Sequence, residues 1–113
     1  MLVFFVAIML AGCMSTPNEA REGKAIFTLE SNKTANDLAS CIYEGWTNTR
    51  ALLERDNTTH TERGVERITV FTWHDTMFVD ITSGEKSKAA FYKTVGGAYV
   101  LADNRIEVIK SCE

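Results

Sequence analysis

The feature that most constrains this chain is an apolar run at its start. Residues 2–10 read LVFFVAIML and contain no charged or hydrogen-bonding side chain. Even when it is extended to Met14, the run is shorter than the roughly 20 residues needed to cross a hydrocarbon core of about 30 Å. A short apolar run at this position is typical of the hydrophobic region of a signal peptide. A buried first helix is the alternative, but the run has no polar face and the polar segment 15–18 follows it.

The run ends in a short motif. Residues 10–13 read LAGC, which resembles the lipobox of bacterial lipoproteins. The resemblance implies that the Cys13 thiol receives a diacylglycerol, that a dedicated peptidase cuts before Cys13, and that the lipid anchors the chain to a membrane. We therefore expect a signal peptide over residues 1–12, a lipidated tether over 13–23 and one globular domain over 24–113. An ordinary secretory signal and a cytosolic chain are the alternatives.

The cysteine count fits this interpretation. The chain has three cysteines, and assigning Cys13 to the lipid leaves Cys41 and Cys112 as an even pair. Because disulfides form and persist in oxidising compartments, we predict a Cys41–Cys112 disulfide; two unpaired buried thiols are the alternative. The other soft metal ligands, His60 and His74, have no spacing typical of a zinc site. The sequence therefore predicts no metal and no cofactor.

Composition narrows the classes of partner. The formal net charge is −3, and charged residues make up 24% of the chain without long runs of one sign. Binding to nucleic acid needs a basic patch that neutralises phosphates, and electrostatic attraction to an anionic membrane needs clustered Lys and Arg. We therefore expect no nucleic-acid partner and a membrane contact that depends on the covalent lipid.

The first half of the globular domain predicts one strand and one long helix. Residues 24–29 (KAIFTL) are a candidate strand. Apolar side chains recur at helical spacing within residues 31–54, and Thr34 followed by Asp37 three positions later is typical of a helix N-terminus. Residues 54–64 are polar and predict a loop.

The second half is dominated by strand patterns. Residues 65–73, 77–82 and 88–95 are rich in β-branched and aromatic residues, and short turns separate them. Residues 98–101 predict one more short strand. Short links between neighbouring strands imply an antiparallel meander. Residues 104–112 combine strand propensity with the pattern of a helix cap, and we favour a short helix there.

These elements predict the α+β class. We expect one main helix packed on a four- to five-stranded antiparallel sheet, in two layers, with a short C-terminal helix in addition. The order of lipobox, strand, helix ending at Trp46, several strands and a late cysteine resembles a group of small, largely uncharacterised lipoproteins of Gram-negative bacteria and their prophages. That group lends the chain no activity. In enterobacterial lipoproteins an Asp after the lipidated cysteine retains the protein in the inner membrane. Met14 stands at that position here, so the resemblance implies the outer membrane, facing the periplasm.

Few residues are candidates for catalysis. His74 and Asp75 are adjacent and lie near His60 and Asp80 in the sequence, and a His beside a carboxylate can do acid–base chemistry. Residues 74–76 occupy an expected turn, however, where Asp commonly makes local hydrogen bonds. We therefore expect that the protein is not an enzyme.

Aromatic residues are the stronger candidates for function. Phe71 and Trp73 are expected on one face of a strand, and Phe78 lies on the next strand. If the helix covers one sheet face alone, these three residues form an exposed surface that binds a protein. The alternative is that the sheet curls or that loops cover this face.

The sequence therefore favours a membrane-anchored, non-enzymatic module that binds a protein of the bacterial envelope. The alternative function is to bind a small or lipidic ligand between helix and sheet.

Overall fold

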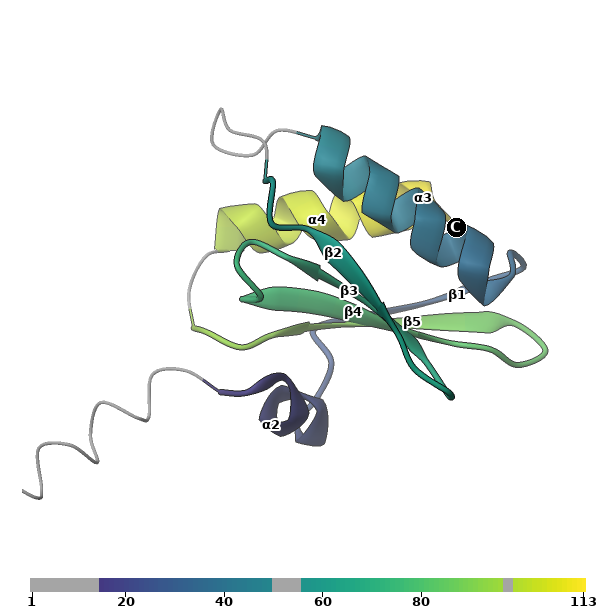
Figure 1. Cartoon of the computed structure of the whole chain (residues 1–113), viewed down its shortest axis with the longest axis horizontal. Helices are drawn as coiled ribbons and strands as arrows, with labels where there is room; N and C mark the ends of the chain where they lie inside the picture. Colours follow the sequence, from purple (N-terminus) through teal and green to yellow (C-terminus); the bar gives the residue numbers. More distant parts are fainter. Residues whose placement is uncertain (1–14, 50–55, 97–98) are drawn as a thin grey trace, which may run out of the picture.

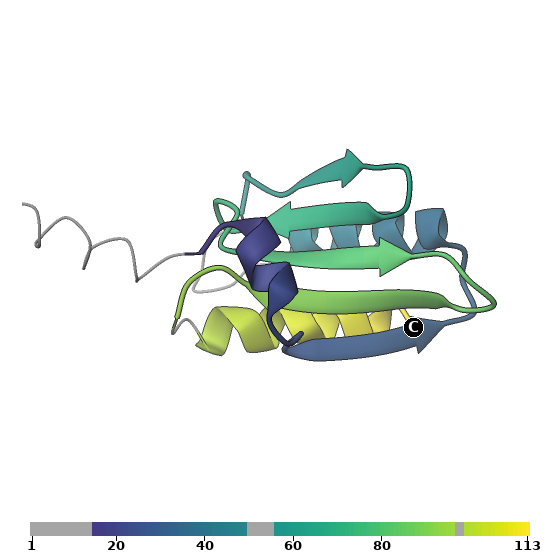
Figure 2. The same cartoon turned by 90° about the horizontal axis from the view of Figure 1, so that it is seen from below.

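A five-stranded antiparallel sheet forms the centre of the molecule, with α3 and α4 on one face and α2 on the other (Figures 1 and 2). The computed structural model describes residues 15–49, 56–96 and 99–113. The elements are α2 (Pro17–Glu22), β1 (Phe27–Ser31), α3 (Ala35–Asn48), β2 (His60–Arg63), β3 (Ile68–Thr72), β4 (Met77–Thr82), β5 (Ser87–Lys93) and α4 (Tyr99–Ser111). The predicted α+β class is confirmed. Among the helices of the described ranges, none has the length and apolar character to cross a membrane.

The sheet combines a meander with one long-range pairing. Strands β2 to β5 pair in chain order, and β1 pairs with β5, which gives the order β1-β5-β4-β3-β2. In this register Phe27 lies opposite Phe91, and Phe91 lies opposite Val79. Strands β1 and β2 are therefore the two edges, and α3 connects them across one face of the sheet.

Helix α3 begins after Thr34, at the cap that the sequence predicts, but Ser31, which was expected to belong to the helix, ends β1. The Thr34 side chain accepts a hydrogen bond from the backbone N–H of Asp37 (3.1 Å), and a cap of this kind satisfies one of the unpaired donors at a helix start. The buried face of the helix packs on the sheet and consists of Ala35, Leu38, Ala39, Ile42 and Trp46. The helix ends at Asn48, and the rest of the predicted helix, residues 50–54, lies outside the described residues.

Helix α4 corrects one prediction. Tyr99 to Leu101 were expected in a strand, but they form the first turn of α4; residue 98 of that predicted strand lies outside the described residues. The helix favoured for 104–112 is confirmed and is longer than expected. Its buried residues, Ala102, Arg105, Val108 and Ile109, recur at helical spacing. Packing of this stripe against α3 and β1 overrides the strand propensity of the first residues.

Strand β2 corrects a second prediction. Residues 54–64 were expected to be a loop, but His60–Arg63 form an edge strand that pairs with β3. Its sequence, HTER, has no apolar alternation, so the pattern on which strand prediction depends is missing. The turn predicted at residues 74–76 is confirmed.

Helices α3 and α4 approach each other closely at Gly45. A Cβ atom added at this position would lie 2.4 Å from Cγ1 of Val108. Val108 is buried, and its β-branched side chain has little freedom to move away. The close packing of the two helices therefore depends on the missing side chain at position 45.

We expect Gly45→Ala to destabilise the fold by about 1–2 kcal/mol because overpacking at Val108 costs more than the helix propensity that alanine adds. Urea unfolding of the two proteins measures this difference. In a double-mutant cycle, Val108→Ala should relieve the clash, so that the double variant loses less stability than the sum of the two single variants. Simple additivity would contradict the contact.

Candidate functional site

Helix α2 is the one helix of the described residues that lies on the outer face of the sheet (Figure 2). The helix is short, and it begins with a full capping box. The Thr16 side chain accepts from the N–H of Glu19 (3.2 Å), and the Glu19 carboxylate accepts from the N–H of Thr16 (3.4 Å). Pro17 occupies the first helical position, where its fixed φ is favourable. This segment was expected to be a tether over 13–23, but from Ser15 onward it packs on the sheet.

Arg21 attaches α2 to the sheet. Its Nε and Nη2 atoms donate to the two carboxylate oxygens of Asp80 on β4 at 2.7 and 2.9 Å. The Thr69 hydroxyl donates to the same carboxylate at 2.7 Å. Both charged side chains are largely buried, with 17% of Arg21 and 10% of Asp80 exposed. A bidentate ion pair of this kind fixes the orientation of the two side chains as well as their position, so it holds α2 in one place on the sheet.

A row of rings lies beneath this ion pair, across four strands. His60 stacks on Phe71 with ring centroids 5.0 Å apart, Phe71 contacts Phe78 at 5.5 Å, and Phe78 stacks on Tyr92 at 5.2 Å. The guanidinium of Arg21 lies 4.9 Å from the centre of the Phe78 ring. The row and α2 together form a small second core on the outer face.

The structure therefore corrects the expected aromatic surface. Phe71 is 5% exposed and Phe78 is fully buried, so neither forms an open patch. Trp73 does not share their face: its backbone φ is 49°, which turns the chain, and its ring packs against the core on the helix side. The face around Phe78 is covered, as the alternative required, but the cover is helix α2 and not a loop or a curl of the sheet.

The remainder of the outer face is open and forms a groove of about 740 Å³ beside α2. Its floor is β1, β5 and β4, and its rim is charged. The lining includes Arg21, Thr28, Glu30, Arg67, Asp80, Thr82, Lys88, Ala90 and Tyr92. Arg21 is neutralised by Asp80, and Lys88 lies 3.9 Å from Glu30. Within the described part of the chain, the side chain of Arg67 has no ion-pair partner.

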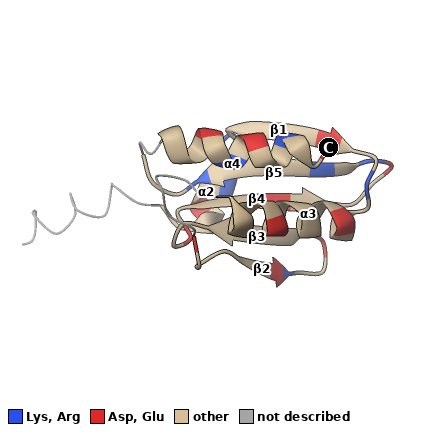
Figure 3. Ribbon diagram, turned by 90° about the horizontal axis from the view of Figure 1, so that it is seen from above, with Lys and Arg blue, Asp and Glu red and all other residues tan. Residues whose placement is uncertain are grey.

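The two layers of the molecule differ in charge. Seen from the helix side, the ribbon of α3 carries acidic positions alone, whereas α4 carries both acidic and basic positions (Figure 3). Helix α3 carries Asp37 and Glu44 and no Lys or Arg. The groove on the opposite face has three cations, Arg21, Arg67 and Lys88, against two carboxylates. The groove is thus a positive area on a chain whose formal net charge is −3.

The histidine and carboxylate side chains that were considered for catalysis do not form one cluster: Asp80 lies apart from His60, His74 and Asp75. His60 and Asp75 come together, with Nδ1 of His60 3.6 Å from the Asp75 carboxylate, and both side chains are about half exposed. His74 is exposed, and its backbone N–H is bound by Thr58. Asp80 is engaged by Arg21 on the outer face. Among the described residues no group of three or more His, Cys, Asp or Glu side chains has the arrangement of a metal site.

Asp56 organises the sharp turn between β3 and β4. Trp73, His74 and Asp75 all have positive φ, which is strained for residues other than glycine. The Asp56 carboxylate accepts from the N–H of Trp73 (2.6 Å) and from the Thr72 hydroxyl (2.9 Å). Burial acts to raise the pKa of Asp56, but hydrogen bonds from Thr58, Trp73 and Thr59 outweigh it and hold this pKa far below 3.8. Asp56 is therefore ionised and stabilises the strained turn.

Arg105 is a buried cation whose charge interacts with that of Asp56. Its side chain is fully buried on α4, and its guanidinium lies 5.3 Å from the ring centre of Trp73. Burial lowers the pKa of Arg105, and the charge of Asp56 raises it. The Arg105 guanidinium also donates to the backbone oxygen of Trp46 (3.0 Å), and the Trp46 indole donates back to the oxygen of Arg105 (3.0 Å).

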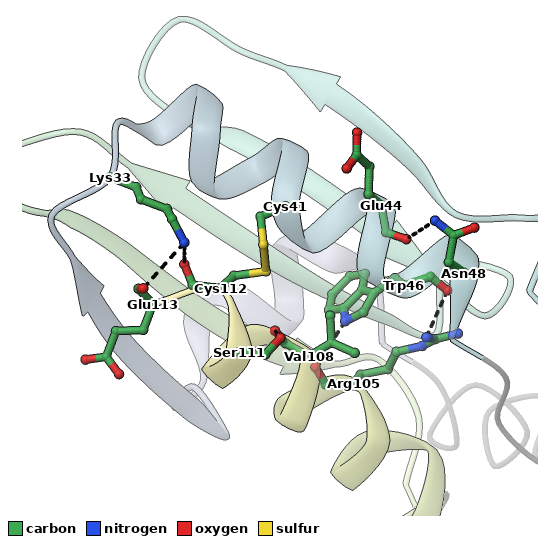
Figure 4. Close-up of a disulfide and its surroundings, with 10 residues drawn as sticks. All are labelled: Lys33, Cys41, Glu44, Trp46, Asn48, Arg105, Val108, Ser111, Cys112 and Glu113. Carbon is green, nitrogen blue, oxygen red and sulfur yellow. Dashed lines mark hydrogen bonds between the residues drawn. A yellow bond between two sulfur atoms is a disulfide. The ribbon is translucent and has the colours of Figure 1, made fainter.

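The predicted disulfide joins the middle of α3 to the C-terminal end of α4 (Figure 4). Cys41 on α3 and Cys112, directly after α4, have their sulfur atoms 2.06 Å apart. The Lys33 ammonium donates to the backbone oxygens of Cys112 and Glu113. Together with the Trp46–Arg105 hydrogen bonds, these contacts fasten α3 to α4 at two separate places.

Cys13, the predicted lipidation site, lies outside the described residues. The sequence reasoning missed Arg21, Asp56 and Arg105. For α2 the signal was present, since Thr16, Pro17 and Glu19 have the spacing of a capping box. No local pattern marked Asp56, whose partners lie up to 17 positions away.

We expect Arg21→Gln to destabilise the protein by roughly 2 kcal/mol, because Asp80 would keep a largely buried charge without its partner. Amide hydrogen exchange of residues 17–22 should also accelerate, since α2 loses its attachment. Arg21→Lys should recover part of the stability, because it restores the positive charge but not the bidentate hydrogen bonding to Asp80. The matched control is Lys24→Gln, an exposed cation just after the helix; an equal loss in both variants would contradict the role of Arg21.

No protein-family model, curated protein or solved structure matches this chain.

Proposed function

We propose that the protein is a lipid-anchored, non-enzymatic binding module of the bacterial envelope. In this proposal the lipid is attached to Cys13, and an acidic surface or segment of an envelope protein binds in the groove beside α2. The outer membrane, on its periplasmic side, is the proposed location. The observation that carries the proposal is the groove itself, a hollow of about 740 Å³ with a charged rim on the open face of the sheet.

The cysteines support the anchored, exported part of the proposal. The Cys41–Cys112 disulfide uses two of the three cysteines, and disulfides of this kind are typical of proteins outside the cytosol. Cys13 is then the one cysteine left, and it stands at the end of the LAGC motif. Lipid attachment and disulfide formation thus account for every cysteine of the chain.

The charges of the groove support an acidic partner. Arg67 is exposed at the rim, and Lys88 is held only by a loose contact of 3.9 Å to Glu30. Opposite potentials on two surfaces favour encounter and suppress wrong partners. The acidic outer surface of α3 makes the helix side a poor site for the same partner.

The packing of the core favours a binding site on the outer face of the sheet rather than one between the helices and the sheet. Leu38, Ile42 and Trp46 of α3 meet Val79 and Phe91 of the sheet, and all five side chains are fully buried. A ligand bound between these layers would have to displace core side chains. We therefore prefer protein binding in the groove to the alternative of a small or lipidic ligand between helix and sheet.

Site-specific photocrosslinking in living cells tests the partner. A photoreactive amino acid is placed at Thr82 or Lys88, which are exposed in the groove, and at Glu44 or Glu107, which are exposed on the helix side. We expect both groove positions to capture the same envelope protein and the helix positions to capture none of it. Arg67→Glu should remove most of that crosslink. Capture of the same protein from the helix side, or a yield unchanged by Arg67→Glu, would contradict the proposal.

The anchor is tested by Cys13→Ser. Without the thiol there is no acceptor for the lipid, so the variant should remain unprocessed or become soluble. Membrane fractionation and sensitivity of processing to globomycin provide the readout. A variant that fractionates with membranes as the native chain does would refute the lipid anchor.

A further inference from the structure

The start of the described chain is fixed to one end of the sheet. The Ser15 N–H and hydroxyl both donate to the backbone oxygen of Thr94, at 2.8 and 3.2 Å. The N–H of Thr94 in turn donates to the oxygen of Thr76, at 2.8 Å. Cys13 is two residues before Ser15, and two residues of chain span at most about 7 Å. A lipid on Cys13 therefore attaches directly beside this end of the domain.

This end also carries exposed apolar side chains. Tyr99 and Val100, the first residues of α4, are 73% and 68% exposed. The Lys93 ammonium lies 4.4 Å from the ring centre of Tyr99. Figures 1 and 2 show that the start of the described chain, the end of β5 and the start of α4 lie at the same end, while the β4–β5 turn lies at the other. We call Ser15, Thr76, Thr94, Tyr99 and Val100 the anchor end.

The side chains of the anchor end suit the boundary between lipid and water. Tyrosine is enriched at that boundary because its ring is apolar and its hydroxyl is polar. Val100 offers apolar area that water solvates poorly.

We propose that the anchor end rests on the membrane surface, with Tyr99 and Val100 at the level of the headgroups. This inference rests on the lipid anchor at Cys13. The short distance from Cys13 to Ser15 is the reason for choosing a lipid surface as the occupant. In this orientation β5 runs from Ser87, far from the membrane, to Lys93, close to it. The long axis of the groove then points away from the membrane, and Lys88 lies at the end farther from the membrane, where a partner can reach it.

Two exposed valines at opposite ends allow a matched test. Val100 is 68% exposed at the anchor end, and Val65 is fully exposed in the β2–β3 turn. Cys13 carries the lipid and Cys41 is bonded to Cys112, so a cysteine introduced at either valine is the one free thiol. Each variant, Val100→Cys or Val65→Cys, is spin-labelled and reconstituted as the acylated protein in vesicles of phosphatidylethanolamine and phosphatidylglycerol.

We expect the label at position 100 to lose most of its accessibility to a water-soluble nickel complex and to gain accessibility to oxygen, whereas the label at 65 stays accessible to nickel. Mass spectrometry and vesicle flotation report acylation separately. A chain that is not acylated overturns the anchor, and the orientation with it. An acylated, vesicle-bound chain with both labels equally accessible to water overturns the orientation alone. Shielding at 100 that disappears when the protein is diluted in lipid indicates a second copy, and also overturns it.

Discussion

Replacing both bridging cysteines, in the variant Cys41→Ala/Cys112→Ala, is expected to lower the free energy of unfolding by about 4 kcal/mol. The bridge joins residues separated by 71 positions, and a crosslink that closes a long loop removes many conformations from the unfolded chain. Domains of this size have a total stability of about 5–15 kcal/mol. Urea unfolding, followed by circular dichroism, measures the loss.

Chemical reduction provides the control for this prediction. The native chain in excess dithiothreitol should unfold at nearly the same urea concentration as the double variant, because both lack the crosslink. The reductant should leave the double variant unchanged. A native chain whose midpoint does not move on reduction would show that the bridge contributes nothing to stability.

The second large effect is expected from Asp56→Asn, which should cost about 3 kcal/mol at neutral pH. The side chain is 4% exposed and accepts hydrogen bonds from Thr58, Thr59, Thr72 and Trp73. An amide cannot accept all of these, and its own N–H groups would face donors. The substitution also removes the negative charge that compensates the buried Arg105.

The cost of Asp56→Asn should depend on pH. The pKa of Asp56 is held below its ordinary value of 3.8 in the folded state, so the folded state binds fewer protons than the unfolded state near that value. The stabilisation by Asp56 is therefore complete above the unfolded pKa and is lost as the pH falls through the folded pKa. Urea unfolding at pH 7 and pH 3 should show a smaller difference between the native chain and the variant at the lower pH.

Asp75→Asn is the matched control, because Asp75 lies in the same turn with 55% of its side chain exposed. Its loss should stay within about 0.5 kcal/mol, as is usual for exposed positions. If Asp56→Asn is as mild as Asp75→Asn at neutral pH, Asp56 does not hold the strained turn.

The parts of the fold that were predicted are those with a strong local pattern. The amphipathic stripe and Thr34 cap of α3 define that helix, and alternating β-branched residues define β3 and β4. Strand β2 was missed because an edge strand with polar residues is stabilised by pairing with β3 rather than by its own side chains. The strand prediction was wrong for residues 99–101, because the packing of α4 outweighs their strand propensity.

The candidate site was hardest to predict because its residues meet only in three dimensions. Arg21 and Asp80 are 59 positions apart, and no local pattern pairs them. Phe78 was expected on an exposed face because the helix that covers it lies in a segment interpreted as a tether. Trp73 was assigned to the face of Phe71 by alternation, but its positive φ breaks the alternation at that residue.

The pairing of β1 with β5 has a consequence for the order of folding. Phe27 pairs with Phe91, which lies on the last strand of the chain, and sheets that depend on such distant pairings fold slowly. For a chain that crosses a membrane in an extended form, β1 would emerge early and wait as an unpaired strand. Unpaired strand edges promote aggregation, so we expect the yield of folded protein to depend most on how long β1 stays unpaired.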